Sequence, residues 1–281
     1  MIRPRLKRIL AAVVPNGMKR AFQERLFSCL KLNWRLTSGV EFEVLSPTDW
    51  SLLNDIFIEG EYDCVINLLI GHVQSNASGV VVDLGSNVGF FELRLFHMLQ
   101  RAGLNARQVR VYAVEPDVDN IAEFHRRVAK AGAWHSSVTV VRGVVGRVKS
   151  GGATYWKSHQ HHSCTADRGR KYPGAWPVSA EYVDIQSLLP SGVDVDLLKC
   201  DIEGAELDFI EGYADLLRRV ATLVIEIHDP SHAAQIRQHL YDAGLCYEHM
   251  VTNRSMNSVH VFAREVIRSG PPARVRQASG G

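Results

Sequence analysis

The stretch Val80–Gly89 limits what this chain can fold into more than any other stretch. It opens with three consecutive valines, which are β-branched and apolar and are typical of a strand buried on both faces of a parallel sheet. Asp83 stands at the end of this strand, Gly85 and Gly89 bracket a tight turn, and Phe90–Leu99 has the pattern of an amphipathic helix. A strand, a glycine turn and a helix direct backbone N–H groups and a helix N-terminus toward a ligand.

The spacing of the glycines does not match the dinucleotide-binding pattern. A G-x-G-x-x-G motif that begins at Gly85 requires glycine at the positions of Asn87 and Phe90. Asp83, just ahead of the turn, would repel a phosphate and suits a cation or a hydroxyl group. These features disfavour an NAD-dependent dehydrogenase, and a tight turn that binds no ligand stays open as an alternative.

Composition places the chain among ordinary globular proteins. Its 281 residues are 46% hydrophobic and 22% charged, which is enough for one large α/β domain with a small appendage. The formal net charge of +2 gives no indication of a nucleic acid partner. No stretch approaches about eighteen uncharged apolar residues, so we expect no transmembrane helix.

The cysteines are widely spaced and include no C-x-x-C pair: Cys29, Cys64, Cys164, Cys200 and Cys246. This pattern indicates neither a disulfide framework nor a zinc site, so we expect reduced thiols in a cytoplasmic protein. The neighbouring His159, His161 and His162 lack the second ligand pair of a zinc site, and a polar or substrate-facing loop is favoured there.

Apolar runs of strand length alternate with helical patterns along the rest of the chain. The predicted strands after the first are 109–114, 138–141, 195–200 and 221–227, followed by an antiparallel pair at 247–251 and 258–263. The predicted helices include 49–57, 62–72, 118–131, 205–217 and 233–243. This alternation predicts an α/β fold with a doubly wound, mostly parallel sheet.

Three parts are expected along the chain. Residues 1–59 form an N-terminal appendage, helical up to residue 38 and followed by a short strand at 41–45; residues 60–268 form the α/β domain, and 269–281 form a disordered tail. The basic N-terminus could contact a membrane surface peripherally, but a solvated helix is the favoured interpretation. Residues 151–180, rich in Gly, Ser, His and Arg, are expected to be a functional loop or a partly ordered insertion.

Several predicted strands end in a polar residue, and such ends meet at one edge of a doubly wound sheet. Glu115 ends the strand that follows Asp83, and a carboxylate there can accept hydrogen bonds from the hydroxyl groups of a ribose. This interpretation fits any nucleoside cofactor. A solvated carboxylate is the alternative.

A second polar group is the segment Leu-Leu-Lys-Cys-Asp-Ile-Glu-Gly-Ala-Glu, which ends at Glu206. Lys199 and Asp201 share one face of the extended strand, and Glu203 follows at the turn into a helix. These side chains could orient a substrate hydroxyl, act as a general base or hold a divalent ion. A helix cap by Glu203 is the alternative.

The third polar group is Glu226 and His228, on the predicted neighbour of the strand that carries Asp201. A histidine can take up a proton near neutral pH. Asp201, Glu226 and His228 would together make a metal site with oxygen and nitrogen ligands. A hydrogen-bonded structural histidine is the favoured interpretation, and metal dependence stays open.

Four segments together resemble the FkbM family of S-adenosylmethionine-dependent methyltransferases: Val-Val-Asp-Leu-Gly-Ser-Asn-Val-Gly, Val-Glu-Pro, Lys-Cys-Asp-Ile-Glu-Gly-Ala-Glu and Val-Ile-Glu-Ile-His. The resemblance covers about residues 60–265, and the third segment is its most specific part. It implies a seven-stranded, Rossmann-like class I methyltransferase sheet whose last strand runs antiparallel. It also implies O-methylation of a hydroxyl on a sugar, glycan, polyketide or other secondary metabolite.

The resemblance also implies roles for individual residues. The cofactor S-adenosyl-L-methionine would be bound by Asp83, Gly85, Asn87, Gly89 and Glu115, with Val145 near its adenine. Proton removal from the acceptor hydroxyl would fall to Asp201, Lys199 and His228. A nucleoside-binding module without catalysis is the alternative from another class. The acceptor and the oligomeric state cannot be read from the sequence.

Overall fold

The computed structural model describes residues 25, 27, 29–30, 32–158, 161–165, 175–254 and 257–264, with the side chains of 161–165 outside the description. The basic N-terminus and the predicted tail at 269–281 lie outside these residues. No helix in the described part of the chain is long and apolar enough to cross a bilayer.

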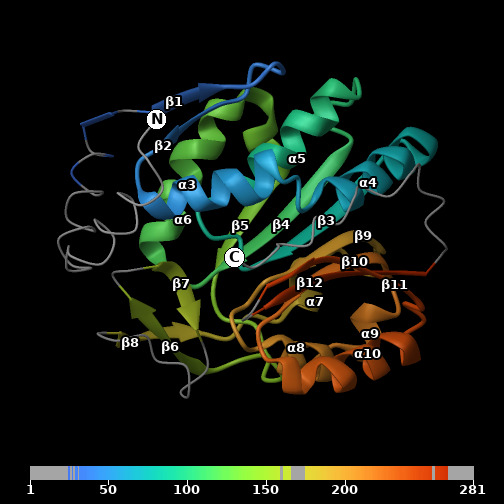
Figure 1. Ribbon diagram of the computed structural model, residues 1–281. Helices are drawn as coiled ribbons and strands as arrows, with labels where there is room; N and C mark the ends of the chain where they lie inside the picture. Colours follow the sequence, from blue (N-terminus) through green and yellow to red (C-terminus); the bar gives the residue numbers. More distant parts are fainter. Residues whose placement is uncertain are drawn as a thin grey trace, which may run out of the picture.

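A seven-stranded sheet forms the centre of the molecule, in the order β11-β12-β10-β9-β3-β4-β5 (Figure 1). Its strands in chain order are β3 Gly79–Leu84, β4 Val109–Glu115, β5 Val138–Arg142, β9 Val195–Cys200, β10 Val220–Ile227, β11 Tyr247–Asn253 and β12 Ser258–Ala263. The strands β3, β4, β5, β9 and β10 are parallel, and β12 runs antiparallel to both β10 and β11. The predicted α/β fold with a mostly parallel seven-stranded sheet and an antiparallel last pair is confirmed.

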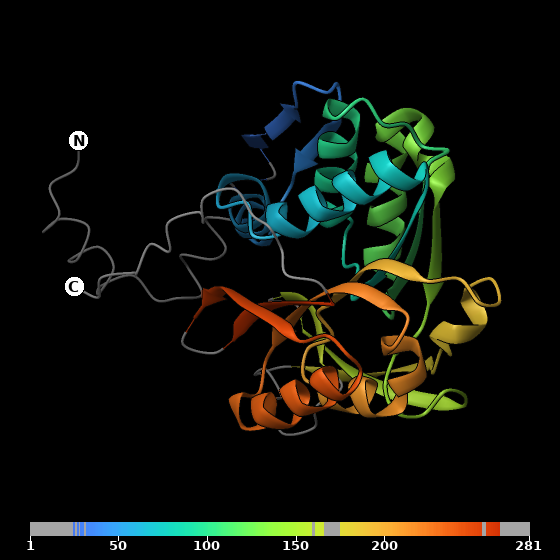
Figure 2. The same ribbon diagram turned by 90° about the vertical axis from the view of Figure 1, so that its right-hand side faces the viewer.

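Helices cover both faces of this sheet in three layers (Figures 1 and 2). One face carries α4 Asp63–Asn76, α5 Phe90–Arg101 and α6 Val118–Val128; the other carries α7 Ile185–Leu188, α8 Glu206–Gly212, α9 Ala214–Leu217 and α10 Ala233–Asp242. Successive strand residues point to opposite faces, so Val81 and Leu197 join the first core whereas Val82 and Leu198 join the second. Shorter helical turns lie at Asn54–Ile58, Ala129–Ser137 and Pro230–His232.

The segment ahead of the sheet differs from the prediction in one respect. Leu32–Arg35 forms strand β1, which pairs with β2 at Glu41–Val44, so the predicted helix up to residue 38 is wrong at these positions. Gly39, at φ +92°, permits the tight turn that brings the two strands together. Helix α3 follows at Pro47–Leu53. The predicted domain boundary at residue 59 stays a prediction.

Residues 152–181 contain a small antiparallel sheet in place of the irregular loop that composition favoured. Its order is β7-β6-β8, with β6 Gly152–Ser158 at the centre and β7 His161–Thr165 and β8 Trp176–Glu181 at the edges. Pro177 pairs with Trp156 on an edge strand, where a residue without an N–H group is tolerated. The glycines, histidines and prolines of this segment hid the strand pattern in the sequence, and the strands form because β7 and β8 pair with β6.

Candidate active site

The strand order reverses between β3 and β9, and a cleft lies beyond the carboxyl ends of β3, β4 and β9. Such a reversal is the usual ligand site of an open α/β sheet. Gly85, at φ +78°, forms part of the wall, and a Cβ atom there would lie 1.8 Å from the backbone oxygen of Asp201. The predicted glycine turn is therefore a position that only glycine can occupy.

Glu115 lies at the bottom of this cleft and is buried. Its carboxylate accepts hydrogen bonds from the backbone N–H of Asn87 at 3.0 Å, the backbone N–H of Asp117 at 3.1 Å and Nδ2 of Asn120 at 3.0 Å. Burial raises the pKa of Glu115 to about 7, although the three donors oppose this shift. Three donors fill three of roughly four lone-pair positions on a carboxylate, which leaves Oε2 one further hydrogen bond.

Lys199 and Asp83 form a buried ion pair between the two central strands. They are direct partners in the parallel register of β3 and β9, so their side chains lie on one face of the sheet. Lys199 Nζ lies 2.9 Å from Asp83 Oδ1 and donates a hydrogen bond to the carbonyl oxygen of Gly85 at 3.1 Å. Although burial opposes the charge, Asp83 and Asp201 raise the pKa of Lys199 above its ordinary value. Lys199 is therefore a fixed cation at neutral pH.

Glu92, on α5, faces this ion pair and is fully buried. In the described part of the chain, neither oxygen of Glu92 has a hydrogen-bond donor, and neither does Oδ2 of Asp83. Burial and the neighbouring Asp83 raise the pKa of Glu92 well above its ordinary value. Glu92 therefore stands as a buried acidic group beside the carboxylate of Asp83, where its protonated form is favoured over its charged form. The sequence analysis missed it; a single acidic residue on the apolar face of a helix was the available signal.

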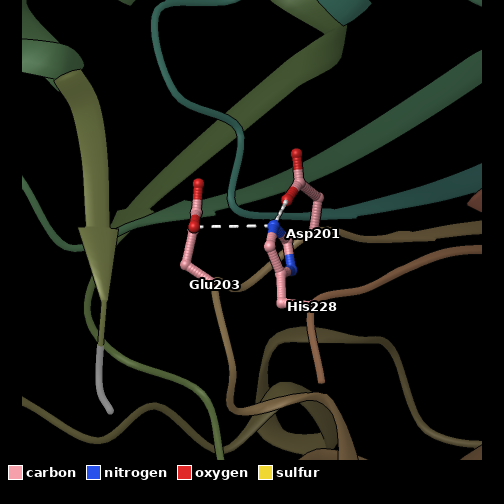
Figure 3. A group of neighbouring side chains, drawn as sticks. All are labelled: Asp201, Glu203 and His228. Atoms are coloured by element: carbon pink, nitrogen blue, oxygen red, sulfur yellow. Dashed lines mark ion pairs between the residues drawn. The ribbon is translucent and has the colours of Figure 1, made fainter. Parts of the chain in front are cut away.

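The end of β10 brings His228 to the rim of the cleft, where four carboxylates surround its ring. Nδ1 lies 2.8 Å from Oε1 of Glu206, and Nε2 lies 3.5 Å from Oε2 of Glu203 and 3.8 Å from Oδ1 of Asp201 (Figure 3). Oε1 of Glu226 lies 3.6 Å from Nε2 on another side. The ligand atoms of Asp201, Glu203 and His228 all lie within 4.8 Å of one another.

Charge and burial act together on this group. Burial alone would lower the pKa of His228, but the hydrogen bond to Glu206 and the carboxylates of Glu203 and Asp201 raise it to about 10. Burial and Asp201 raise the pKa of Glu226 to about 8, although His228 opposes the shift. Glu226 also accepts a hydrogen bond from Nδ2 of Asn257.

The structure brings most of the predicted site residues to one cleft. Of the predicted cofactor residues, Gly85, Asn87, Glu115 and Val145 line it, and so does the predicted catalytic residue Asp201. Asp83 and Gly89 lie behind the lining: Asp83 bonds Lys199, and Gly89 forms the N-cap of α5 against Phe124. The other two predicted catalytic residues lie beside Asp201: Nε2 of His228 is 3.8 Å and Nζ of Lys199 is 3.9 Å from its carboxylate.

Two further findings were not expected. Tyr155, on β6, lines the cleft from the small sheet, and the prediction of a loop there concealed it. Glu203 does not cap a helix, because the N-cap of α8 is Ala205. The carboxylate of Glu203 instead lies 3.5 Å from Nε2 of His228. Glu203, rather than the predicted Glu226, completes the compact group with Asp201 and His228. His159 and the side chains of His161, His162 and Cys164 lie outside the described residues.

Comparison with known proteins identifies the family. The family model described as "Methyltransferase FkbM domain" matches residues 83–247, more than half of the chain. No curated protein matches the sequence.

Solved structures show weaker similarity. The methyltransferase FkbM of Methylobacillus flagellatus KT is 17% identical, with a TM-score of 0.46 over 66% of this chain. This chain spans 43% of the length of that protein. The N-terminal domain of human METTL16 in complex with SAH is 14% identical, with a TM-score of 0.45 over 95% of this chain and 99% of that one. M. capricolum TrmK is 10% identical, with a TM-score of 0.40 over 74% of this chain and 68% of that one.

The matched segment begins at Asp83 and takes in Glu115, Asp201 and His228, which are the residues around the cleft. The chain therefore belongs to the FkbM family of S-adenosylmethionine-dependent methyltransferases.

Proposed function

We propose that this protein is an O-methyltransferase that transfers a methyl group to a hydroxyl on a sugar, glycan or secondary metabolite. The observation that carries the proposal is the position of Asp201. Asp201 lines the cleft, and its carboxylate is 3.8 Å from Nε2 of His228, so a group able to accept a proton stands at the cleft wall beside a histidine whose raised pKa keeps it charged. We propose no nucleic acid as the methyl acceptor. We also propose that the protein acts in the cytoplasm.

The residues of the cleft fit S-adenosylmethionine as a ligand. The close approach of Gly85 to Asp201 leaves a backbone wall free of side chains, and Glu115 keeps one hydrogen-bonding position on Oε2 for a ribose hydroxyl. Val145, Val144 and Tyr155 form an apolar wall, which suits an adenine ring. The cofactor, when bound, supplies a methyl group already activated on a sulfonium.

The side chains at the rim of the cleft orient the acceptor hydroxyl and remove its proton. Asp201 orients the acceptor hydroxyl and accepts its proton, and the charged ring of His228, 3.8 Å away, holds the Asp201 carboxylate in place. Lys199 is not a base, because its Nζ is buried and held by Asp83 and by the carbonyl of Gly85. We assign it a positioning role: it ties the glycine turn of β3 to the end of β9.

The substitution Asp201→Asn tests the proposal. Removing a general base costs roughly 10²–10⁴-fold in rate, whereas the affinity for S-adenosylhomocysteine should change less than about twofold because Asn keeps the shape of the wall. Calorimetry measures binding, and labelled methyl transfer to a panel of sugar and metabolite hydroxyls measures turnover. Asp208→Asn, on the exposed surface of α8, is the matched control.

Three results would contradict the proposal. Equal losses of binding and turnover in Asp201→Asn would remove its catalytic role. Binding of S-adenosylhomocysteine without methyl transfer to any hydroxyl would favour a nucleoside-binding module without catalysis. Binding of NAD in place of S-adenosylhomocysteine would favour a dehydrogenase.

A further inference from the structure

We propose that Asp201, Glu203 and His228 form a site for a divalent cation that accepts both nitrogen and oxygen ligands, with Mn²⁺ as the best match. The site follows from the geometry of these residues. Its role in methyl transfer, described below, rests on the proposed function.

The orientation of the His228 ring is the first observation. The residue is 8% exposed, and its Nε2 points at the carboxylates of Asp201 and Glu203 (Figure 3). The separations of 3.8 and 3.5 Å exceed the 2.7–3.2 Å typical of a hydrogen bond, so this buried nitrogen forms ion pairs with the two carboxylates that are long enough for a cation to replace its proton between them. The ligand atoms of the three residues lie within 4.8 Å of one another, so small side-chain rotations would bring all three to a cation placed between them.

The other ring nitrogen of His228 is hydrogen-bonded to a carboxylate, as is common for histidines that bind a metal. Nδ1 lies 2.8 Å from Oε1 of Glu206, which is 1% exposed and also accepts the backbone N–H of Gly204 at 2.9 Å. A carboxylate in this position keeps the proton on Nδ1, so Nε2 would become the ligand atom when a cation displaces its proton. The arrangement is a carboxylate–histidine pair directed at an acidic pocket.

The backbone around Glu203 supports the same conclusion. Glu203 has φ +52°, in the left-handed region that non-glycine residues rarely adopt, and Gly204 follows at φ +101°. This conformation turns the Glu203 carboxylate away from the first turn of α8 and toward Nε2 of His228.

The ligand set and its exposure favour one class of ion. Carboxylate oxygens suit Mg²⁺, Ca²⁺ and Mn²⁺, whereas imidazole nitrogen suits transition metals such as Fe, Ni, Cu and Zn, so a site with two carboxylates and one imidazole points to Mn²⁺, the transition metal among the ions that carboxylates prefer. Asp201 and Glu203 have side chains 27% and 24% exposed, so the site is accessible to an ion from solvent. The nearby Lys199 does not occupy the site, because its Nζ is 2.9 Å from Asp83 and 3.9 Å from Asp201.

A cation in this position would act on the acceptor of the proposed reaction. A hydroxyl oxygen bound to a divalent ion loses its proton more easily, as metal-bound water does. Asp201 would then hold the ion that orients the hydroxyl, and Glu226, 3.6 Å from Nε2, would be the nearest base outside the ligand set.

The experiment is a titration of the purified full chain, freed of metal with a chelator, with Mn²⁺. Binding removes the sharp paramagnetic resonance signal of free Mn²⁺, and we expect one ion per chain. Glu203→Gln and His228→Gln should each weaken binding by at least about tenfold, since each removes one ligand. Asp208→Asn neutralises an exposed acid on the nearby helix α8 and should bind Mn²⁺ as the unmodified protein does. Circular dichroism confirms that each variant is folded.

The outcomes separate this site from the proposed function. No loss of the free Mn²⁺ signal, or equal binding by all variants, overturns the site. Methyl transfer that persists unchanged after chelation, together with absent Mn²⁺ binding, overturns the site and leaves the methyltransferase intact. Mn²⁺ binding that depends on Glu203 and His228, without any methyl transfer, supports the site and contradicts the proposed function.

Discussion

Glu115 combines burial with a binding role, and this combination makes the cleft sensitive to pH. In the free protein its pKa is raised to about 7, mainly by burial. The proposed hydrogen bond from a ribose hydroxyl requires the carboxylate, because a protonated oxygen is a weaker acceptor. A ligand that prefers the deprotonated form therefore binds less well as the pH falls through this value.

We predict that the affinity for S-adenosylhomocysteine falls as the pH is lowered from 8 to 6. The dissociation constant should rise by at most about tenfold per pH unit, the limit for one proton. Glu115→Gln should bind more weakly at every pH and show a flatter profile. Calorimetry at three pH values measures both proteins, and a wild-type profile as flat as that of the variant would contradict the assignment.

The raised pKa of Glu115 affects the free energy of unfolding in the opposite direction, as pH rises, from its effect on cofactor affinity. In the unfolded chain Glu115 releases its proton near its ordinary pKa of about 4.5, while the native state retains it up to about 7. The native state therefore binds more protons in this window, and its contribution to the free energy of unfolding falls as the pH rises. Cofactor affinity and stability thus change in opposite directions across this range.

Among the elements, the small sheet β7-β6-β8 depends on a few polar contacts to stay beside the cleft. Nζ of Lys157 lies 2.7 Å from Asp117 and 2.5 Å from Asp119, and the hydroxyl of Tyr155 donates to Asp117 at 3.2 Å. Asp117 is 1% exposed and caps α6 through the backbone N–H groups of Asp119 and Asn120. The sheet is therefore anchored to the helix that follows Glu115.

Lys157→Met should destabilise the protein by roughly 1–3 kcal/mol, because it leaves the buried Asp117 carboxylate without its cation. It should also weaken S-adenosylhomocysteine binding, since Tyr155 on the same strand lines the cleft. Urea denaturation and calorimetry measure the two effects. Arg218→Met is the matched control: it breaks the exposed pair with Asp215 and should cost less than about 1 kcal/mol. Equal effects of both substitutions would show that the anchor is unimportant.

At the scale of the whole molecule, the segment before residue 59 is joined to the sheet domain by its core and by one buried ion pair. Phe42 and Leu53 belong to the same hydrophobic core as Phe90. Asp49, on α3, lies 2.7 Å from Nη2 of Arg127 on α6, and both side chains are almost fully buried. Breaking this pair removes a buried partner of Arg127 and leaves its charge to Glu123, 2.6 Å from its Nε.

Asp49→Asn should lower the free energy of unfolding by roughly 3 kcal/mol and keep a single thermal transition. The single transition follows because the segment and the sheet domain share one core. Differential scanning calorimetry tests both points, and Asp215→Asn on the exposed surface of α9 is the matched control. Two separate transitions would show that residues 1–59 unfold as an independent domain.

Much of the main sheet follows from local pattern. Buried strands such as Gly79–Leu84 and Val195–Cys200 are mostly apolar, and the polar residues near their carboxyl ends mark the edge where a ligand binds. The turn at Gly85 is equally local, because its positive φ is available to glycine at little cost. Family, fold and the position of the cleft could therefore be predicted from segments of ten residues or fewer.

Contacts between segments were decided only by the tertiary structure. Glu92 became a buried acid because β3 and α5 bring it against Asp83, and Tyr155 reached the cleft because β6 pairs on both sides. Glu203 replaced Glu226 beside Asp201 and His228 because one left-handed backbone torsion redirects its side chain. Sequence determines which residues share a strand face through the period of the backbone. Strand register and single torsions then determine which side chains meet, and these depend on the packing of the whole chain.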